Sequence, residues 1–522
     1  MDYLDYVSMT KGQRFGYRVK SFFVGIPKAI KAFFLLIGYF IKKIFLGIAH
    51  FFQNYGRRFA KGDAGTKLSY VIMGMGNIFH GQIVKGLIFL GIQVGYIIFM
   101  INFGVRYLVR IDNPNWTVLR WDFYHGAYRM GTHAVGIEVA KFGDTSTGVE
   151  GILNMGTYDD SSKILLFFIL TVVVTIVFLA IYIANTKSAY YTQQLRAEGK
   201  KPDNIVKEIK SFFDERFHVT LLILPVLLLC TFTILPILYT VLMAFTNYDV
   251  DHLTPTSLFQ WVGFNNFASV FVSNPQKSET FGKILLWTIV WAIFATFTNY
   301  IFGIILALMI NKKGIKFKAF WRTVFVITTA VPQFVTLLVM KLLLSDNGAV
   351  NGLVGSLNIE GLDYIPFLSD GNWARITVIV VNMWVGIPYT MLITSGLLMN
   401  IPEDLYESAR IDGANTVQQF FKITLPYIFF VTTPYLITTF VGNINNFNVI
   451  YFLTAGGPNV AEYYCAGKTD LLVTWLYKLT TGAKPDYKLA AVIGILIFIL
   501  CAAGSLITFN LSKSSKNEEE FS

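Results

Sequence analysis

The sequence has little charge and little cysteine. Asp, Glu, Lys and Arg make up 14% of its 522 residues, whereas a soluble protein carries about 25%. The three cysteines, Cys230, Cys465 and Cys501, are far apart and two of them lie in apolar runs, so we predict neither a disulfide framework nor a metal site. The N-terminus is polar with no apolar core beside it, so we expect no cleavable signal peptide.

Long apolar runs dominate instead. Hydrophobic residues make up 54% of the chain and the mean hydropathy is +0.53. Each run has the length that a bilayer core requires. We therefore predict an all-α polytopic membrane protein with eight transmembrane helices, near residues 84–104, 164–184, 219–242, 284–310, 320–344, 375–397, 427–450 and 489–511.

The predicted spans contain no Asp, Glu or His between their ends, and Lys85, Arg322 and Lys341 lie near those ends. Proton- or ion-coupled carriers normally place ionisable groups inside the membrane, so their absence argues against such a carrier. A membrane-embedded enzyme would need paired acids, His or metal ligands at that depth. We expect no catalytic residue and no metal ligand in this chain.

The sequence also lacks a complete nucleotide-binding motif. Gly467-Lys468-Thr469 looks like the end of a phosphate loop, but Glu462 stands where that motif needs its first Gly. We therefore expect no cofactor on this chain, with ATP and Mg held by a separate ATPase.

The charged residues behind the net charge of +11 are unevenly distributed among the loops. Lys and Arg gather in loops 185–217 and 311–318, whereas loop 105–163 is rich in acids. The positive-inside rule explains this better than a nucleic-acid partner does, and it places both termini on the cytoplasmic side of the membrane.

The N-terminal stretch 11–61 mixes cations with Phe and Ile, and its uncharged runs are too short to span a membrane. An amphipathic segment lying on the membrane lipid is favoured over a distorted span. The predicted organisation is an N-terminal amphipathic extension, a transmembrane hairpin with its outer loop 105–163, a cytoplasmic linker, a C-terminal membrane core and a cytoplasmic tail: residues 1–83, 84–184, 185–218, 219–511 and 512–522.

The polar stretch Ile401–Pro426 interrupts the core between two apolar runs. Pro402 followed by two acids is typical of a first helical turn, and Gly413 is a predicted C-cap. Thr416 is the predicted N-cap of a second helix, which Pro426 would stop. The pattern predicts two short helices joined at a glycine.

This stretch resembles the EAA motif of permease subunits of binding-protein-dependent ABC importers, with Ser in place of the second residue. The resemblance implies a type I ABC importer permease fold whose loop docks on an ATPase. It also implies a homologous second permease subunit, two copies of the ABC ATPase and an extracellular sugar-binding protein as partners. The implied ATPase-coupling residues are Glu407, Ser408, Ala409, Gly413, Ile423, Leu425 and Pro426.

Uncharged polar residues gather in the sixth and seventh predicted spans, as VNMWVGIPYTM and GNINNFNVIY. An unpaired amide in hydrocarbon costs several kcal/mol, so these side chains must face protein or a wet cavity. Amides bind sugar hydroxyls as donor and acceptor, and aromatic rings pack on sugar CH faces. A neutral sugar pathway is favoured over the alternative that these Asn side chains only join helices.

Residues 219–511 are similar to the larger maltose/maltodextrin permease subunit. The resemblance implies uptake of maltose or maltodextrin by alternating access. A raffinose-type oligosaccharide or glycerol phosphate is the alternative substrate, and a channel would leave the coupling motif without a purpose. The implied sugar contacts are Thr329, Gln333, Asn382, Val385, Gly386, Tyr389, Gly442, Asn443 and Asn446, of which Gly442 and the span-five positions depart from the family pattern.

Overall fold

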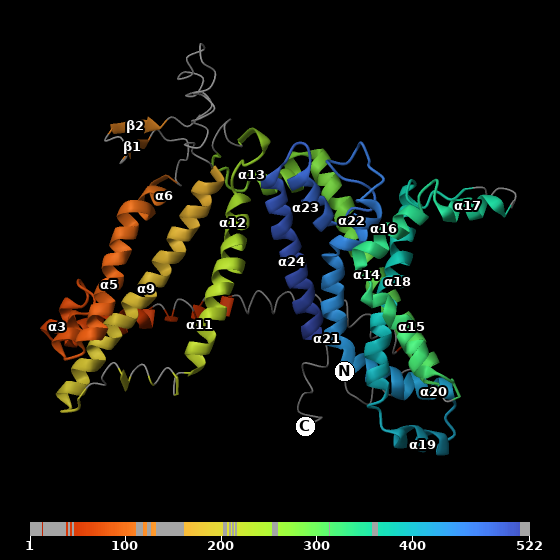
Figure 1. The fold of residues 1–522 in the computed structure, drawn as a ribbon, viewed down its shortest axis with the longest axis horizontal. Coiled ribbons are helices and arrows are strands. Elements are labelled where there is room, and N and C mark those ends of the chain that lie inside the picture. Colours follow the sequence, from red (N-terminus) through yellow and green to blue (C-terminus); the bar gives the residue numbers. More distant parts are fainter. Residues whose placement is uncertain are drawn as a thin grey trace, which may run out of the picture. The chain divides into compact units, whose positions relative to one another are not determined.

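The structure is a computed structural model (Figure 1) that describes residues 49–110, 161–201, 217–252, 259–312, 314–357 and 364–511, two short strands and a few isolated residues. The chain divides into two compact units. The N-terminal unit comprises residues 35–266 and 486–488, and the C-terminal unit contains 267–485 and 489–522. The predicted permease core began at residue 219, so its first span falls in the N-terminal unit.

The N-terminal unit consists mainly of helices, several of which join end to end. A π-helical turn, Met100–Gly104, links α5 to α6, and another, Cys230–Ile234, links α11 to α12. The described helices are 49–61, α3 Ala64–Leu68, α4 Met75–Phe79, α5 Ile83–Phe99, α6 Val105–Arg110, α9 Ser161–Ala197, α11 Phe217–Leu229 and α12 Leu235–Met243. Strands β1 Val118–Asp122 and β2 Ala127–Gly131 pair antiparallel, with Val118 opposite Gly131.

Aromatic contacts hold the helices of the N-terminal unit together. Tyr96 on α5 stacks on Phe178 of α9, with ring centroids 3.8 Å apart. The hydroxyls of Tyr55 and Tyr182 lie 2.9 Å apart and join helix 49–61 to α9. Most of the predicted amphipathic stretch lies outside the described residues, as does most of loop 105–163.

Two features of this unit differ from the prediction. Helix α9 continues to Ala197, well past the predicted end of its span at residue 184, because its last turns are polar and hydropathy does not detect them. The two-stranded hairpin was not predicted by the all-α assignment, although the rest of the described chain is helical or irregular.

The C-terminal unit contains the longest helices of the chain together with short helices in its loops. The described helices are α13 Asn265–Ala268 (at the boundary of the units), α14 Pro275–Asn311, α15 Lys318–Ala330, α16 Gln333–Leu343, α17 Ala349–Ser356, α18 Gly371–Leu398, α19 Glu403–Ile411, α20 Thr416–Gln419, α21 Leu425–Ile444, α22 Phe447–Thr454, α23 Leu472–Thr481 and α24 Tyr487–Leu511. Figure 1 shows α14, α18 and α21 running beside one another, and α19 and α20 at one end of them.

The described residues include seven helices long and apolar enough to cross a membrane, or eight spans when one bent pair is included. These positions confirm the eight predicted spans, except that the fifth is not one helix. Its halves, α15 and α16, meet at 89°. Pro332 has no amide hydrogen and disfavours helical geometry at the preceding residue, and Val331 is extended with ψ 130°.

The seventh predicted span is also interrupted. Helix α21 ends at Ile444, and the Asn446 side chain caps α22 by accepting a hydrogen bond from the Val449 amide, 3.2 Å away. Both interruptions leave backbone groups outside a helical ladder, which inside a membrane is tolerated only against protein or a wet cavity.

Helices α14 and α18 form the centre of the C-terminal unit. Gly303 on α14 lies against Thr390 of α18, and Gly386 on α18 lies against Asn299 of α14, with no room for a Cβ at either glycine. Trp291 of α14 is fully buried and its indole donates to the Asn443 carbonyl at 3.1 Å. Glycine at these two positions allows the two backbones to approach closely, as small residues do between membrane helices.

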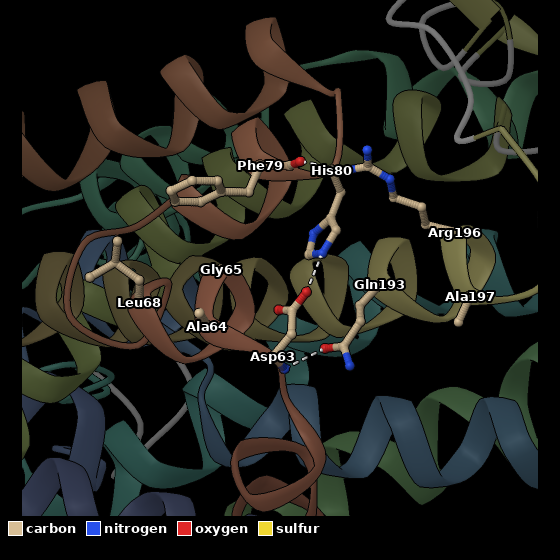
Figure 2. Close-up of a pocket in the computed structure, with 9 residues that line it drawn as sticks. All are labelled: Asp63, Ala64, Gly65, Leu68, Phe79, His80, Gln193, Arg196 and Ala197. Carbon is tan, nitrogen blue, oxygen red and sulfur yellow. Dashed lines mark hydrogen bonds and ion pairs between the residues drawn. The ribbon is translucent and has the colours of Figure 1, made fainter.

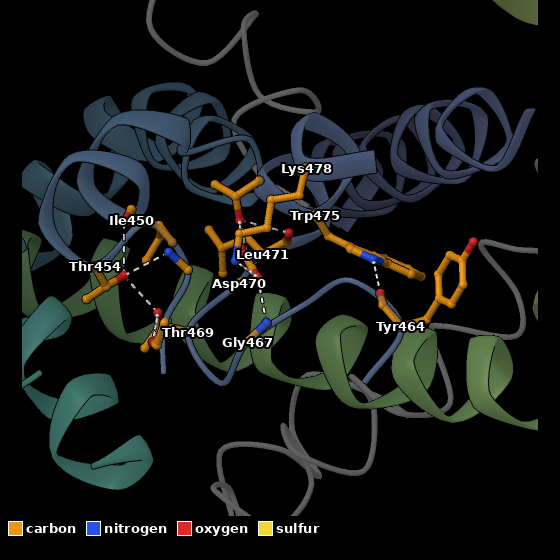
Figure 3. A network of polar contacts seen from close by, with 12 residues as sticks. Ile450, Thr454, Tyr464, Gly467, Thr469, Asp470, Leu471, Trp475 and Lys478 are labelled. Carbon is orange, nitrogen blue, oxygen red and sulfur yellow. Dashed lines mark hydrogen bonds and ion pairs between the residues drawn. The ribbon is translucent and has the colours of Figure 1, made fainter. Parts of the chain in front are cut away.

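A polar network fixes the loop between α22 and α23 (Figure 3). The Asp470 carboxylate is fully buried, and it accepts from the Lys478 ammonium at 2.6 Å, the Gly467 amide at 2.7 Å and the Thr474 hydroxyl at 2.9 Å. Burial raises the pKa of Asp470 above its ordinary value, although Lys478 and the hydrogen bonds act in the opposite direction. Gly456, at φ +77°, packs directly on this carboxylate and has no space for a side chain.

Removing the counter-ion should make stability depend on pH. We expect Lys478→Met to destabilise the protein by about 3–5 kcal/mol near pH 8, because a buried carboxylate loses its partner. The pKa of Asp470 then rises further above the unfolded value of about 3.9, so folding takes up a proton and the loss shrinks as the pH falls toward about 5.

Thermal unfolding of the purified protein in detergent at both pH values measures this effect. Lys283→Met is the matched control, since Lys283 pairs with Glu279 on an exposed helical surface and such pairs contribute about 0.3–0.5 kcal/mol. Equal and pH-independent losses in the two variants would contradict the assignment.

Candidate functional site

Two neighbouring cavities open between the central helices of the C-terminal unit. The first, here called the Asn382 cavity, has a volume of about 250 Å³ and is lined by Thr296, Asn299, Tyr300, Gln333, Asn382, Val385, Gly386, Tyr389, Thr390, Tyr435, Leu436, Thr439 and Asn443. The second, the Thr329 cavity, measures about 380 Å³ and is lined by residues 328–333, Thr336, Trp384, Val385 and Tyr389. Gln333, Val385 and Tyr389 line both.

No side chain lining either cavity belongs to Asp, Glu, Lys, Arg or His, among the residues that the structure describes. Amides, hydroxyls and aromatic rings supply the polar surface. Tyr389 is 55% exposed, and its ring centroid lies 6.2 Å from that of Tyr435. This lining can exchange hydrogen bonds with a neutral ligand and offers no fixed charge to an ionic one.

The structure brings together seven of the nine predicted contact residues. Thr329, Gln333, Asn382, Val385, Gly386, Tyr389 and Asn443 all line one cavity or both. Gly442 is exposed and lines neither cavity. Asn446 caps α22 and lines neither cavity. Its amide nitrogen donates to the side chain of the lining residue Asn443 at 3.3 Å.

Two buried amide side chains in the Asn382 cavity each have one atom without a hydrogen-bond partner in the described part of the chain. The Asn382 side-chain nitrogen is one and the Asn299 side-chain oxygen is the other, and both residues are less than 9% exposed. They come from α18 and α14, the two helices that Gly303 and Gly386 hold together. An unsatisfied buried polar group costs about 1–3 kcal/mol, so a ligand that both donates and accepts hydrogen bonds would relieve both groups.

Other asparagines of the predicted cluster do join helices. The Asn443 amide donates to the Thr296 hydroxyl at 2.9 Å, and the Asn448 amide donates to the Gln333 side chain at 3.1 Å. Asn445 donates to the Cys501 thiol at 3.4 Å. Asn445 and Asn448 therefore only join helices, Asn443 both joins helices and lines the cavity, and Asn382 lines the cavity with a side-chain nitrogen that has no partner among the described residues.

The 401–426 loop forms two helices joined at a glycine, as predicted. Helix α19 is followed by Gly413 at φ +75°. The predicted cap at Thr416 is wrong, because Asn415 caps α20 and forms a reciprocal capping box with Gln418. Pro426 does not end the second helix either, because α20 continues through the π-helical turn Phe420–Thr424 into α21, and Pro426 lies just after that turn.

This loop presents side chains to solvent. Glu407 and Ser408 are exposed, and so are the apolar side chains Ile411, at 87%, Val417 and Phe421. Exposed apolar residues grouped on one loop mark an interaction surface more often than an isolated one does.

Comparison with known proteins decides the family. Residues 299–516 match the family described as "Binding-protein-dependent transport system inner membrane component". The galactooligosaccharides transport system permease protein GanP of Bacillus subtilis is 38% identical over 384 residues, which cover 73% of this chain and 91% of that protein. The chain belongs to this permease family.

The other relatives place the permease close to maltodextrin systems. The maltodextrin transport system permease protein MdxF of Bacillus subtilis is 34% identical over 455 residues, covering 86% of this permease and 95% of MdxF. The maltose/maltodextrin permease protein MalF of Vibrio vulnificus is 38% identical over 275 residues, or 52% of each chain. The likeness to MdxF extends beyond residues 219–511, where we expected it to be confined. The family and the spans together confirm a multi-pass membrane permease.

Several lining residues of the permease were not predicted from the sequence. Asn299, Tyr300, Tyr435 and Thr439 line the Asn382 cavity, yet each lies in a predicted span outside the two polar clusters quoted above. Asn299 was the detectable one, because a single amide within a long apolar span requires a polar partner or a cavity.

Replacing an unsatisfied amide should stabilise the ligand-free permease. We expect Asn382→Leu to raise the melting temperature in detergent, since it removes a buried donor without a partner at a cost of about 1–3 kcal/mol. Asn443→Leu is the matched control and should lower the melting temperature, because it breaks the hydrogen bond to Thr296. A fall for both variants would mean that the Asn382 amide is satisfied.

Proposed function

We propose that this permease imports maltodextrin-type oligosaccharides, and that the Asn382 and Thr329 cavities hold the sugar during its passage. The observation that carries the proposal is the cavity lining: unpartnered Asn299 and Asn382, hydroxyls, aromatic rings and no charged side chain. A sugar supplies hydroxyls for the amides and CH faces for Tyr389 and Tyr435. The names of MdxF and MalF support the same substrate class.

A galactooligosaccharide is the second candidate. Raffinose-type sugars also contain galactose. GanP is named for galactooligosaccharides and is 38% identical to this chain. Glycerol phosphate is disfavoured, because a phosphate ester calls for Lys or Arg in its site and the described lining has neither.

The chain would work in an assembly with four kinds of parts. A homologous permease would complete the pathway, and an extracellular binding protein would deliver the sugar. Two ABC ATPase subunits would bind ATP and Mg and drive alternating access through the 401–426 loop. With both termini in the cytoplasm, this loop lies on the ATPase side of the membrane.

Sugar-stimulated ATP hydrolysis tests the substrate. The permease, its second subunit, the ATPase and the binding protein would be reconstituted in nanodiscs with maltotriose, longer maltodextrins, galactooligosaccharides or glycerol phosphate. We expect maltodextrins to give the largest stimulation. Stimulation by galactooligosaccharides alone would favour the second candidate, and stimulation by glycerol phosphate alone would refute the proposed role of the cavities.

The coupling role of Glu407 is tested by reversing its charge. We expect Glu407→Lys to abolish sugar uptake while the protein still folds, because losing a charge-assisted contact and placing a cation at a docking surface costs about 2–5 kcal/mol. Uptake into proteoliposomes and ATP hydrolysis would be measured together. Asp214→Lys, an equal charge change at an exposed residue outside the loop, should leave uptake near normal. Normal uptake in Glu407→Lys would defeat the assignment.

A further inference from the structure

A second polar site lies in the N-terminal unit, apart from the sugar pathway. Helices α3 and α4 and the last turns of α9 enclose a cavity of about 620 Å³ (Figure 2). A smaller cavity of about 350 Å³ adjoins it, and the two share Phe79, His80 and Arg196 in their walls. The family assignment gives this region no role.

Hydrogen bonds fix the wall of the larger cavity. The Asp63 carboxylate caps α3 by accepting from the Thr66 amide at 2.7 Å, and its second oxygen lies 2.7 Å from Nε2 of His80. Gln193 accepts from the Asp63 amide at 3.0 Å, and the Arg196 guanidinium donates to the Phe79 carbonyl at 2.7 Å. Figure 2 shows His80 held between Asp63 and Arg196.

One ring nitrogen of His80 is unpaired among the described residues. The side chain is 5% exposed, and its Nδ1 atom has no hydrogen-bond partner. Burial alone would raise the pKa of Asp63, but hydrogen bonds from Thr66 and His80 outweigh it and lower that pKa, so Asp63 is an ionised acceptor. Nε2 of His80 therefore carries the hydrogen toward Asp63, and Nδ1 is the ring atom left for a hydrogen bond to a ligand.

The smaller cavity has the opposite chemistry. Arg196, Lys200 and Lys201 line it, and none of its lining residues in the described part of the chain is an acid. Glu198 pairs with Lys200 at 2.8 Å on the exposed surface, which leaves two of the three cations uncompensated by this acid. An excess of positive charge around a concave surface is suited to a phosphate group.

The site also adjoins an apolar surface. Helix α5 begins at Ile83, three residues after His80, and it is one of the candidate membrane spans. Phe79, Ile83, Val84 and Leu87 are each at least half exposed, so they present hydrocarbon-facing side chains next to the polar cavities. A ligand here would combine an anionic phosphate, a hydrogen-bond donor and an apolar chain.

We propose that the two cavities bind the headgroup of an anionic phospholipid that carries hydroxyl groups, of the phosphatidylglycerol type. Its phosphodiester would lie among Arg196, Lys200 and Lys201, and its hydroxyls would form hydrogen bonds with Nδ1 of His80 and donate to Asp63. Its acyl chains would run along the exposed face of α5. Phosphatidylcholine has no donor in its headgroup, and the ammonium of phosphatidylethanolamine leaves the lipid without net charge to match the cations.

Lipid retention tests the proposal with the full chain in its assembly. The transporter would be purified from membranes that contain all three lipids, and the retained lipid quantified by mass spectrometry. We expect wild type to retain phosphatidylglycerol selectively. The double variant Arg196→Gln with Lys201→Gln should bind it at least about tenfold more weakly, because it loses two charge-assisted contacts. Both side chains are exposed, and a melting temperature equal to that of wild type would show that losing the Arg196 bond to Phe79 leaves the fold intact.

The control separates this site from general attraction to cations. Lys187→Gln removes an exposed charge from the same helix, but Lys187 lines neither cavity, so retention should be unchanged. Equal retention by the double variant and the control would overturn the proposal, and so would equal retention of phosphatidylcholine or phosphatidylethanolamine. Displacement of the lipid by soluble glycerol phosphate would overturn it in favour of a site for soluble phosphate esters.

Discussion

The close approach of α14 and α18 is the constraint on which the sugar pathway depends. Gly303 and Gly386 remove the side chains that would hold these helices apart. Asn299 is consequently pressed against Gly386, in the same cavity wall as Asn382, and neither amide finds a partner for one of its atoms. Because the unsatisfied donor and acceptor are already held in fixed positions, ligand binding loses less side-chain conformational entropy.

Interrupted helices supply the cavity walls that α14 and α18 do not form. The break between α15 and α16 exposes Thr329 and Gln333 to the Thr329 cavity, and the break after α21 leaves Asn446 to cap α22. Pro332 made the first break predictable, because a proline without an amide partner disfavours a straight helix. The second was harder to foresee, since a row of asparagines reads equally well as a polar lining or as a cap.

Membrane spans could be predicted well because hydrocarbon demands about 20 apolar residues in sequence, a local property. The cavity walls could be predicted only in part. Resemblance to a family supplied Asn382 and Tyr389, but it also supplied Gly442, which lines neither cavity. A lone amide such as Asn299 shows only that a polar partner or a cavity is needed, and its place in this cavity follows from contact with Gly386, 87 positions along the chain. Such long-range packing leaves no periodic signal in a single sequence.

The continuity of the helix that follows the 401–426 loop determines how the proposed transport cycle would be driven. Helix continues from Thr416 through a π-helical turn, Phe420–Thr424, into α21. Roughly 40 Å of helix therefore separates the exposed loop from Asn443 in the cavity wall. Because Pro426 does not interrupt it, a displacement of the loop by an ATPase would be carried along α21. If Pro426 had ended the second helix, as the sequence predicted, the loop would have needed a separate connection to the cavity wall, whereas here one continuous helix provides it.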